Sequence, residues 1–88
     1  MTIEHLTLKE LRIRSGLSLR KAGAAIGKVY STVWHWEEGM SNPRDIFELG
    51  ILLNVYGLHP RPEELRSLDR KLFEGANLKD IRFRVVSA

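Results

Sequence analysis

The sequence predicts a small all-α domain, because three features of the chain point the same way. Helix-capping side chains and glycines alternate along it, and the apolar residues between them recur at spacings of three and four. Its 88 residues are enough for one domain rather than two. Apolar residues at 43% and charged residues at 28% are typical of a globular protein. We therefore expect one compact bundle of five helices.

The first two helices begin at recognisable caps. Thr7 and Glu10 form the pattern of a capping box, and the helix that follows is predicted to end near Gly16. Ser18 can cap a second helix that ends at Gly27. This second helix contains Gly23, although glycine within a helix costs about 1 kcal/mol relative to alanine. A close packing contact is therefore the better explanation for that glycine.

Helical spacing also predicts the third and fourth helices. The third runs from about residue 30 to residue 38, with Val33 and Trp36 facing the core. For the fourth helix, Asn42 and Pro43 together form a start signal, a capping side chain followed by a proline in the first turn. Its inward stripe consists of Ile46, Leu49, Leu52, Leu53 and Tyr56.

The C-terminal part of the chain predicts a fifth helix and a possible short β-strand. The helix begins at Pro62 and ends by Gly75, and leucines mark its apolar side. Residues 81–85 alternate apolar and basic side chains, which is the periodicity of a strand. An isolated strand needs a partner, and the simplest partner is its own copy in a second subunit.

Charge is distributed unevenly along the chain. Residues 9–28 contain six basic residues against one acidic residue, a net charge of +5. Residues 29–48 contain one basic residue against four acidic residues, a net charge of −3. Such segregation implies a basic face that suits a polyanionic partner, whereas the plainer alternative is a solvated surface with charges placed by chance.

Two short helices joined by a glycine turn are what a helix-turn-helix requires. The segment from Leu17 to Pro43 resembles the phage repressor and Cro-type (XRE) family of helix-turn-helix proteins, and the resemblance extends over residues 6–58. It implies a lambda-repressor-like bundle in which the third helix enters the major groove of DNA. The matching positions are Leu17-Ser18, Gly27, Ser31-Thr32-Val33, Glu37, Gly39 and Asn42-Pro43.

Four positions depart from the family pattern. Leu19 stands where the family usually has a glutamine that contacts a phosphate, so the neighbouring basic residues or the helix N-terminal amides would have to replace that bond. Gly23 replaces the usual alanine, and Val29 replaces a capping serine or threonine. One extra residue lies between Pro43 and the apolar stripe of the fourth helix.

The resemblance also assigns roles to individual residues. Arg12 and Glu37 match a partly buried ion pair between the first and third helices, so we expect them to stabilise the fold. The expected base contacts form an uncharged, aromatic-rich surface: Tyr30, Ser31, Trp34 and His35. Either aromatic residue could instead turn into the core. The expected phosphate contacts are Lys9, Ser18, Arg20, Lys21, Lys28, Thr32 and Arg44.

The chain divides into a DNA-binding unit, residues 1–58, and a C-terminal segment, residues 59–88, with a dimerisation role. A homodimer would place two third helices about 34 Å apart, one helical turn of DNA. The alternative is that the C-terminal segment completes the core of the monomer. The dimerisation candidates are Leu65, Leu68, Leu72, Ile81, Phe83 and Val85.

Other chemistry is not indicated. The chain has no cysteine, and its three histidines lack the spacing of a metal site, so we expect neither metal nor cofactor. A glycine-rich phosphate loop and a nucleophile elbow are also missing, which argues against an enzyme. We expect no signal peptide and no membrane span. A cytoplasmic, nucleoid-associated protein of a bacterium or phage fits this pattern.

The sequence therefore favours a DNA-binding transcription regulator, most simply a repressor, that recognises specific sites in double-stranded DNA as a homodimer. The alternative is a protein-interaction module, such as an antitoxin or adaptor, in which DNA binding is secondary or absent. Exposed aromatic residues and the modest net charge of +3 keep that alternative open.

Overall fold

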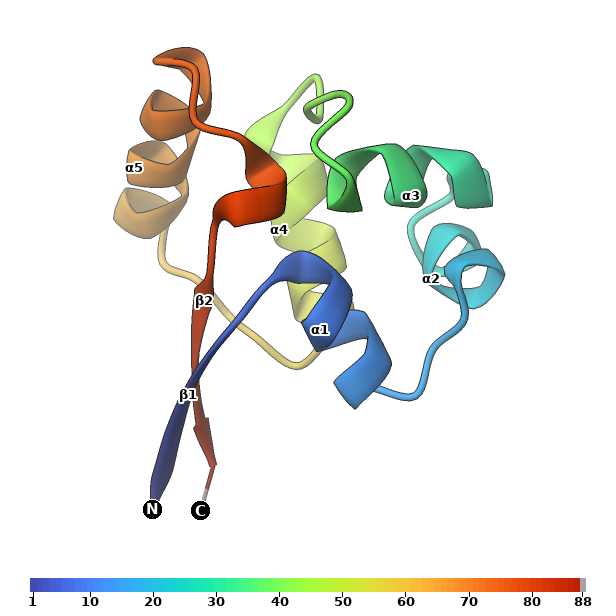
Figure 1. Ribbon diagram of the computed structural model, residues 1–88, viewed down its shortest axis with the longest axis horizontal. Coiled ribbons are helices and arrows are strands. Elements are labelled where there is room, and N and C mark those ends of the chain that lie inside the picture. Colours follow the sequence, from blue (N-terminus) through green and yellow to red (C-terminus); the bar gives the residue numbers. More distant parts are fainter. Residues whose placement is uncertain (88) are drawn as a thin grey trace.

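The computed structural model describes residues 1–87, and in these residues five helices form one body from which a two-stranded sheet extends (Figure 1). Thr2 pairs with Ser87, so the start of the first strand and the end of the second lie together at the far end of this sheet (Figure 1). The protein is a mostly α-helical domain with the five helices that the sequence predicts, but the N-terminal strand was not predicted. The elements are β1 (Thr2–Leu6), α1 (Leu8–Arg14), α2 (Leu19–Ala25), α3 (Tyr30–Glu37), α4 (Ile46–Val55), α5 (Pro62–Phe73), a 3-10 turn η1 (Leu78–Asp80) and β2 (Phe83–Ser87).

The first helix begins where its capping residues predict. The backbone N–H of Glu10 donates to Thr7 Oγ1 at 3.2 Å, and the backbone N–H of Thr7 donates to Glu10 Oε1 at 2.9 Å. The hydrogen bond from the Thr7 backbone N–H lowers the pKa of the Glu10 carboxyl group, because it favours the charged form of that group. Similarly, Ser18 caps α2 by accepting the backbone N–H of Lys21 at 3.1 Å.

The predicted start of the fourth helix is wrong. Helix α4 begins at Ile46 and not beside Pro43, and Asp45 is its N-cap, with Oδ1 accepting the backbone N–H of Phe47 at 2.9 Å. Aspartate caps as well as asparagine, and Asp45 directly precedes the apolar stripe. Asn42 and Pro43 therefore belong to the connection between α3 and α4.

The hydrophobic core gathers side chains from every helix and from β2. Helices α4 and α5 approach closely at Gly50, where an added Cβ would lie 3.3 Å from Leu65 Cδ1. The absence of a side chain at Gly50 lets α5 lie against α4. The largest fully buried side chains of the core are those of Leu8, Leu11, Val33, Leu49, Leu52, Leu53 and Leu78.

The C-terminal strand has its partner within the same chain, which corrects the prediction of pairing with a second subunit. β1 and β2 pair antiparallel, with Ile3 opposite Val86 and Leu6 opposite Phe83. The prediction failed because the short N-terminal segment carries no clear alternation and its partner lies at the other end of the chain. Pairing between such distant segments leaves no local signal in the sequence.

The predicted dimerisation residues also lie inside the single chain. The three leucines of α5 and Val85 are buried, and Ile81 and Phe83 pack partly buried against the core. The alternative, that the C-terminal segment completes the core of the monomer, therefore describes this structure. In the single chain these side chains pack against other parts of the protein: Leu65, Leu68, Leu72, Ile81, Phe83 and Val85.

Candidate nucleic-acid interface

Helices α2 and α3 pack against each other through a contact that requires glycine. A Cβ on Gly23 would lie 2.7 Å from the carbonyl oxygen of Lys28 and 3.2 Å from the backbone nitrogen of Tyr30. Gly23 also accepts the backbone N–H of Lys28 at 2.9 Å. The connection turns at Gly27, whose φ of +71° is the left-handed conformation that glycine adopts without strain. The backbone of α2 thus lies directly against the start of α3, which explains the glycine within the helix.

One face of α3 is directed away from the core. Val33, Trp36 and Glu37 are buried on the inner side. Tyr30 and Trp34 lie one turn apart with 49% and 41% of their surfaces exposed, so neither turns into the core. Ser31 and His35 form a neighbouring row, partly buried, and the Trp34 and His35 rings lie 5.3 Å apart. We call these four residues (Tyr30, Ser31, Trp34 and His35) the reading face.

The predicted phosphate contacts fall into two groups. Five of them lie in α2, in α3 or in the segments next to these helices: Ser18, Arg20, Lys21, Lys28 and Thr32. Lys9 is in the first turn of α1, next to β1, and Arg44 is exposed in the connection before α4. The first group therefore belongs to the pair of helices that carries the reading face, whereas Lys9 and Arg44 lie on other elements.

Two members of this group have partners that the sequence did not reveal. Lys28 Nζ lies 3.0 Å from Glu48 Oε2 on α4, so its charge is partly neutralised before any ligand binds. The guanidinium carbon of Arg20 lies 5.1 Å from the centre of the Tyr30 ring, a cation–π contact between α2 and α3. Lys21 extends from α2 into solvent and carries no such contact among the interactions of residues 1–87.

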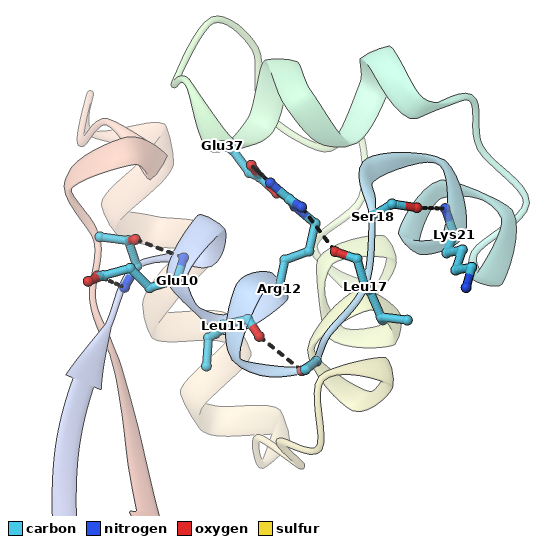
Figure 2. A network of polar contacts seen from close by, with 9 residues as sticks. Glu10, Leu11, Arg12, Leu17, Ser18, Lys21 and Glu37 are labelled. Atoms are coloured by element: carbon cyan, nitrogen blue, oxygen red, sulfur yellow. Dashed lines mark hydrogen bonds and ion pairs between the residues drawn. The ribbon is translucent and has the colours of Figure 1, made fainter.

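A buried ion pair joins α3 to α1 (Figure 2). Arg12 Nε donates to Glu37 Oε2 at 2.7 Å and Arg12 Nη2 donates to Glu37 Oε1 at 3.3 Å. Arg12 Nη1 also donates to the carbonyl oxygen of Leu17 at 3.0 Å, in the connection before α2. Only 12% of the Arg12 side chain and 1% of the Glu37 side chain are exposed. The hydrogen bond to Glu37 raises the pKa of Arg12, so this guanidinium stays charged and joins three segments.

Sequence reasoning missed the environment of Tyr56. This residue was expected in the core, where it lies, but its hydroxyl group is buried with no hydrogen-bond partner among residues 1–87. Burial raises the pKa of Tyr56, and the nearby carboxylate of Glu37 adds to that effect. Its position in an apolar stripe gave no sign that the hydroxyl would face an ion pair.

Nothing in residues 1–87 groups His, Asp or Glu side chains closely enough to hold a metal ion. None of the helices within this range is both long and apolar enough to cross a membrane. Comparisons with models of protein families, with curated proteins and with solved structures gave no match. The functional interpretation therefore depends on the chemistry and geometry of the chain itself.

Proposed function

We propose that this protein is a transcription regulator that binds specific sites in double-stranded DNA through the reading face of α3. The observation that carries the proposal is the arrangement of α2 and α3. Gly23 sets α2 directly against the start of α3, α3 exposes an aromatic and hydroxyl surface, and basic residues of α2 border it. Residues 17–43 also resemble the repressor and Cro-type helix-turn-helix.

The proposed complex places α3 in the major groove, which at about 12 Å wide admits one α-helix. Residues near the N-terminus of such a helix contact base edges. Ser31 and His35 can form hydrogen bonds with bases, and the exposed rings of Tyr30 and Trp34 can contact thymine methyl groups. Lys21, which forms no ion pair within residues 1–87, would supply a phosphate contact that sets the position of the helix.

The protein would regulate transcription by occupying an operator, most simply by blocking transcription. It would bind as a homodimer, in the cytoplasm of a bacterium, and be encoded by the bacterium or by a phage. Two reading faces about 34 Å apart would contact the two halves of a roughly palindromic site. Because Leu65, Leu68, Leu72 and Val85 are buried in the monomer, the dimer would form through surface outside these four residues.

Selection of bound sites from a pool of random duplexes tests the proposal. We expect a single enriched motif, and an affinity that falls with salt at a log–log slope of about −0.9 per phosphate contact. Trp34→Ala should weaken binding to the selected site, whereas Phe73→Ala, which removes a side chain that is 92% exposed on α5, should leave it unchanged. Equal affinity for all sequences, or none at any salt concentration, would contradict the proposal.

One observation favours a second function, a protein-interaction module. Helix α4 is apolar on its outer side as well as its inner side, with Phe47 62% and Ile51 52% exposed one turn apart. A shallow hollow of about 160 Å³ lies beside them. Under this alternative, Phe47→Ser would abolish capture of a protein partner while Trp34→Ala would not. If the protein is a DNA-binding regulator, Trp34→Ala should weaken binding to the selected DNA site and Phe47→Ser should not.

A further inference from the structure

Arg20 and Tyr30 form one unit at the border of the reading face. Arg20 is the second residue of α2 and Tyr30 is the first residue of α3. The guanidinium carbon lies 5.1 Å from the ring centre, and both side chains are exposed. Arg20 forms none of the ion pairs found within residues 1–87, whereas nearby Lys28 is paired with Glu48. The aromatic ring is thus the contact that orients Arg20.

This contact suits base recognition. A guanidinium group that rests on a ring is held in orientation, while its N–H donors remain free to form hydrogen bonds. Two parallel hydrogen bonds to O6 and N7 of guanine require the fork of an arginine in one orientation. A phosphate can accept the same fork, so the choice between base and phosphate depends on where the pair lies.

The position of the pair supports the same conclusion. Tyr30 begins α3, and the N-terminal residues of a helix in the major groove are those that meet base edges. The reading face itself contains no arginine or lysine, so it lacks the side chains that most often recognise guanine. Arg20 brings a guanidinium to this end of α3 from the neighbouring helix.

We propose that Arg20 is a base-reading residue that recognises one guanine in each half of the bound site, with Tyr30 orienting its guanidinium and packing against a neighbouring thymine methyl group. This inference rests on the proposed function and changes the role expected for Arg20, which the family resemblance placed at a phosphate. The recognised DNA sequence would therefore contain a thymine next to a guanine.

The test is to compare the motifs that the wild-type protein and Arg20→Lys select from a random duplex pool. Lysine keeps the charge but loses the planar fork, so we expect the preference for guanine to fall roughly 10- to 100-fold at one position in each half of the motif. The other positions and the salt dependence should stay the same. If Arg20→Lys selects the same motif with the same strength, Arg20 contacts a phosphate and the inference is wrong.

Two further variants separate base reading from a general electrostatic effect. Lys21→Ala removes the neighbouring charge and should weaken binding to all sequences alike, with a salt slope smaller by about 1. Tyr30→Leu should reduce the same guanine preference as Arg20→Lys, and Tyr30→Phe should restore it because the ring is retained. A guanine preference that survives Tyr30→Leu would overturn the orienting role of the ring.

The outcome for the wild-type protein distinguishes this inference from the proposed function. If the wild-type protein selects no motif, the proposed function fails and the assignment of Arg20 fails with it. If it selects a motif that contains no invariant guanine, the proposed function as a regulator is supported and the role of Arg20 as a guanine reader is excluded. Circular dichroism and thermal unfolding of each variant establish that it remains folded.

Discussion

Helix α3 and strand β2 are both held by other segments of the chain, but the interactions that hold them differ. α3 is fixed by a buried ion pair to α1 and by backbone contact with α2 at Gly23. β2 is held by its hydrogen bonds to β1 and by one buried apolar side chain, Val85, between exposed neighbours. The contacts of α3 depend on exact geometry, because one is a fork of hydrogen bonds and the other leaves no room for a Cβ at Gly23. On β2, exposed side chains can be replaced without changing the contact of Val85 with the core. The helix that carries the candidate interface is therefore held by the more specific contacts.

The largest effect is expected from breaking the ion pair behind α3. Glu37→Ala leaves the charge of Arg12 buried without its partner, which costs about 3–5 kcal/mol of unfolding free energy. Urea denaturation measures this cost, and Glu38→Ala, at the next position but outside the pair, is the matched control. A loss of DNA affinity in Arg12→Ala with an unchanged melting temperature would instead place Arg12 in the DNA interface.

A smaller effect is expected at the contact between α2 and α3. Alanine at Gly23 would bring its Cβ to 2.7 Å from the Lys28 carbonyl oxygen, so the helices must separate. We expect a destabilisation of about 1–3 kcal/mol and weaker binding to the selected DNA site. Thermal unfolding gives the first value. Because alanine favours helix formation, a more stable Gly23→Ala protein would show that the close contact is not needed.

Two adjacent residues of β2 provide a matched pair. Val85→Ala removes methyl groups from a site that is 6% exposed and should cost about 1–2 kcal/mol of unfolding free energy. Val86→Ala acts at a site that is 52% exposed and should change stability by no more than about 0.5 kcal/mol. Equal effects in chemical denaturation would mean that β2 does not present alternate faces to the core and to solvent.

The smallest effect concerns the capping box of α1, next to the sheet. The pKa of Glu10 is lower in the folded protein than its ordinary value of 4.5, so the unfolded chain binds the proton more readily. The stabilisation is therefore present above pH 4.5 and is lost as the pH falls through the lowered pKa. Melting temperatures of wild type and Glu10→Gln, recorded from about pH 6 to about pH 3, should converge at the acid end. Curves that stay parallel would contradict this assignment.

Local signals predicted most of the helical framework. Thr7, Ser18 and Pro62 mark starts that the structure contains, because capping and proline geometry act within a few residues. The start of α4 was misplaced because two capping residues, Asn42 and Asp45, compete within four positions. The apolar stripes identified the buried side of each helix, since periodicity reports burial directly.

For the candidate interface, the sequence determined which residues α3 carries and indicated a close packing contact at Gly23. Both inferences depend on residue type and spacing, which are local properties. Only the tertiary structure decided that Arg20 rests on Tyr30, that Lys28 is paired with Glu48, and that β2 pairs with β1. These interactions join residues from different elements. Their geometry depends on how the helices pack, and packing is set by the whole core rather than by neighbours in the chain.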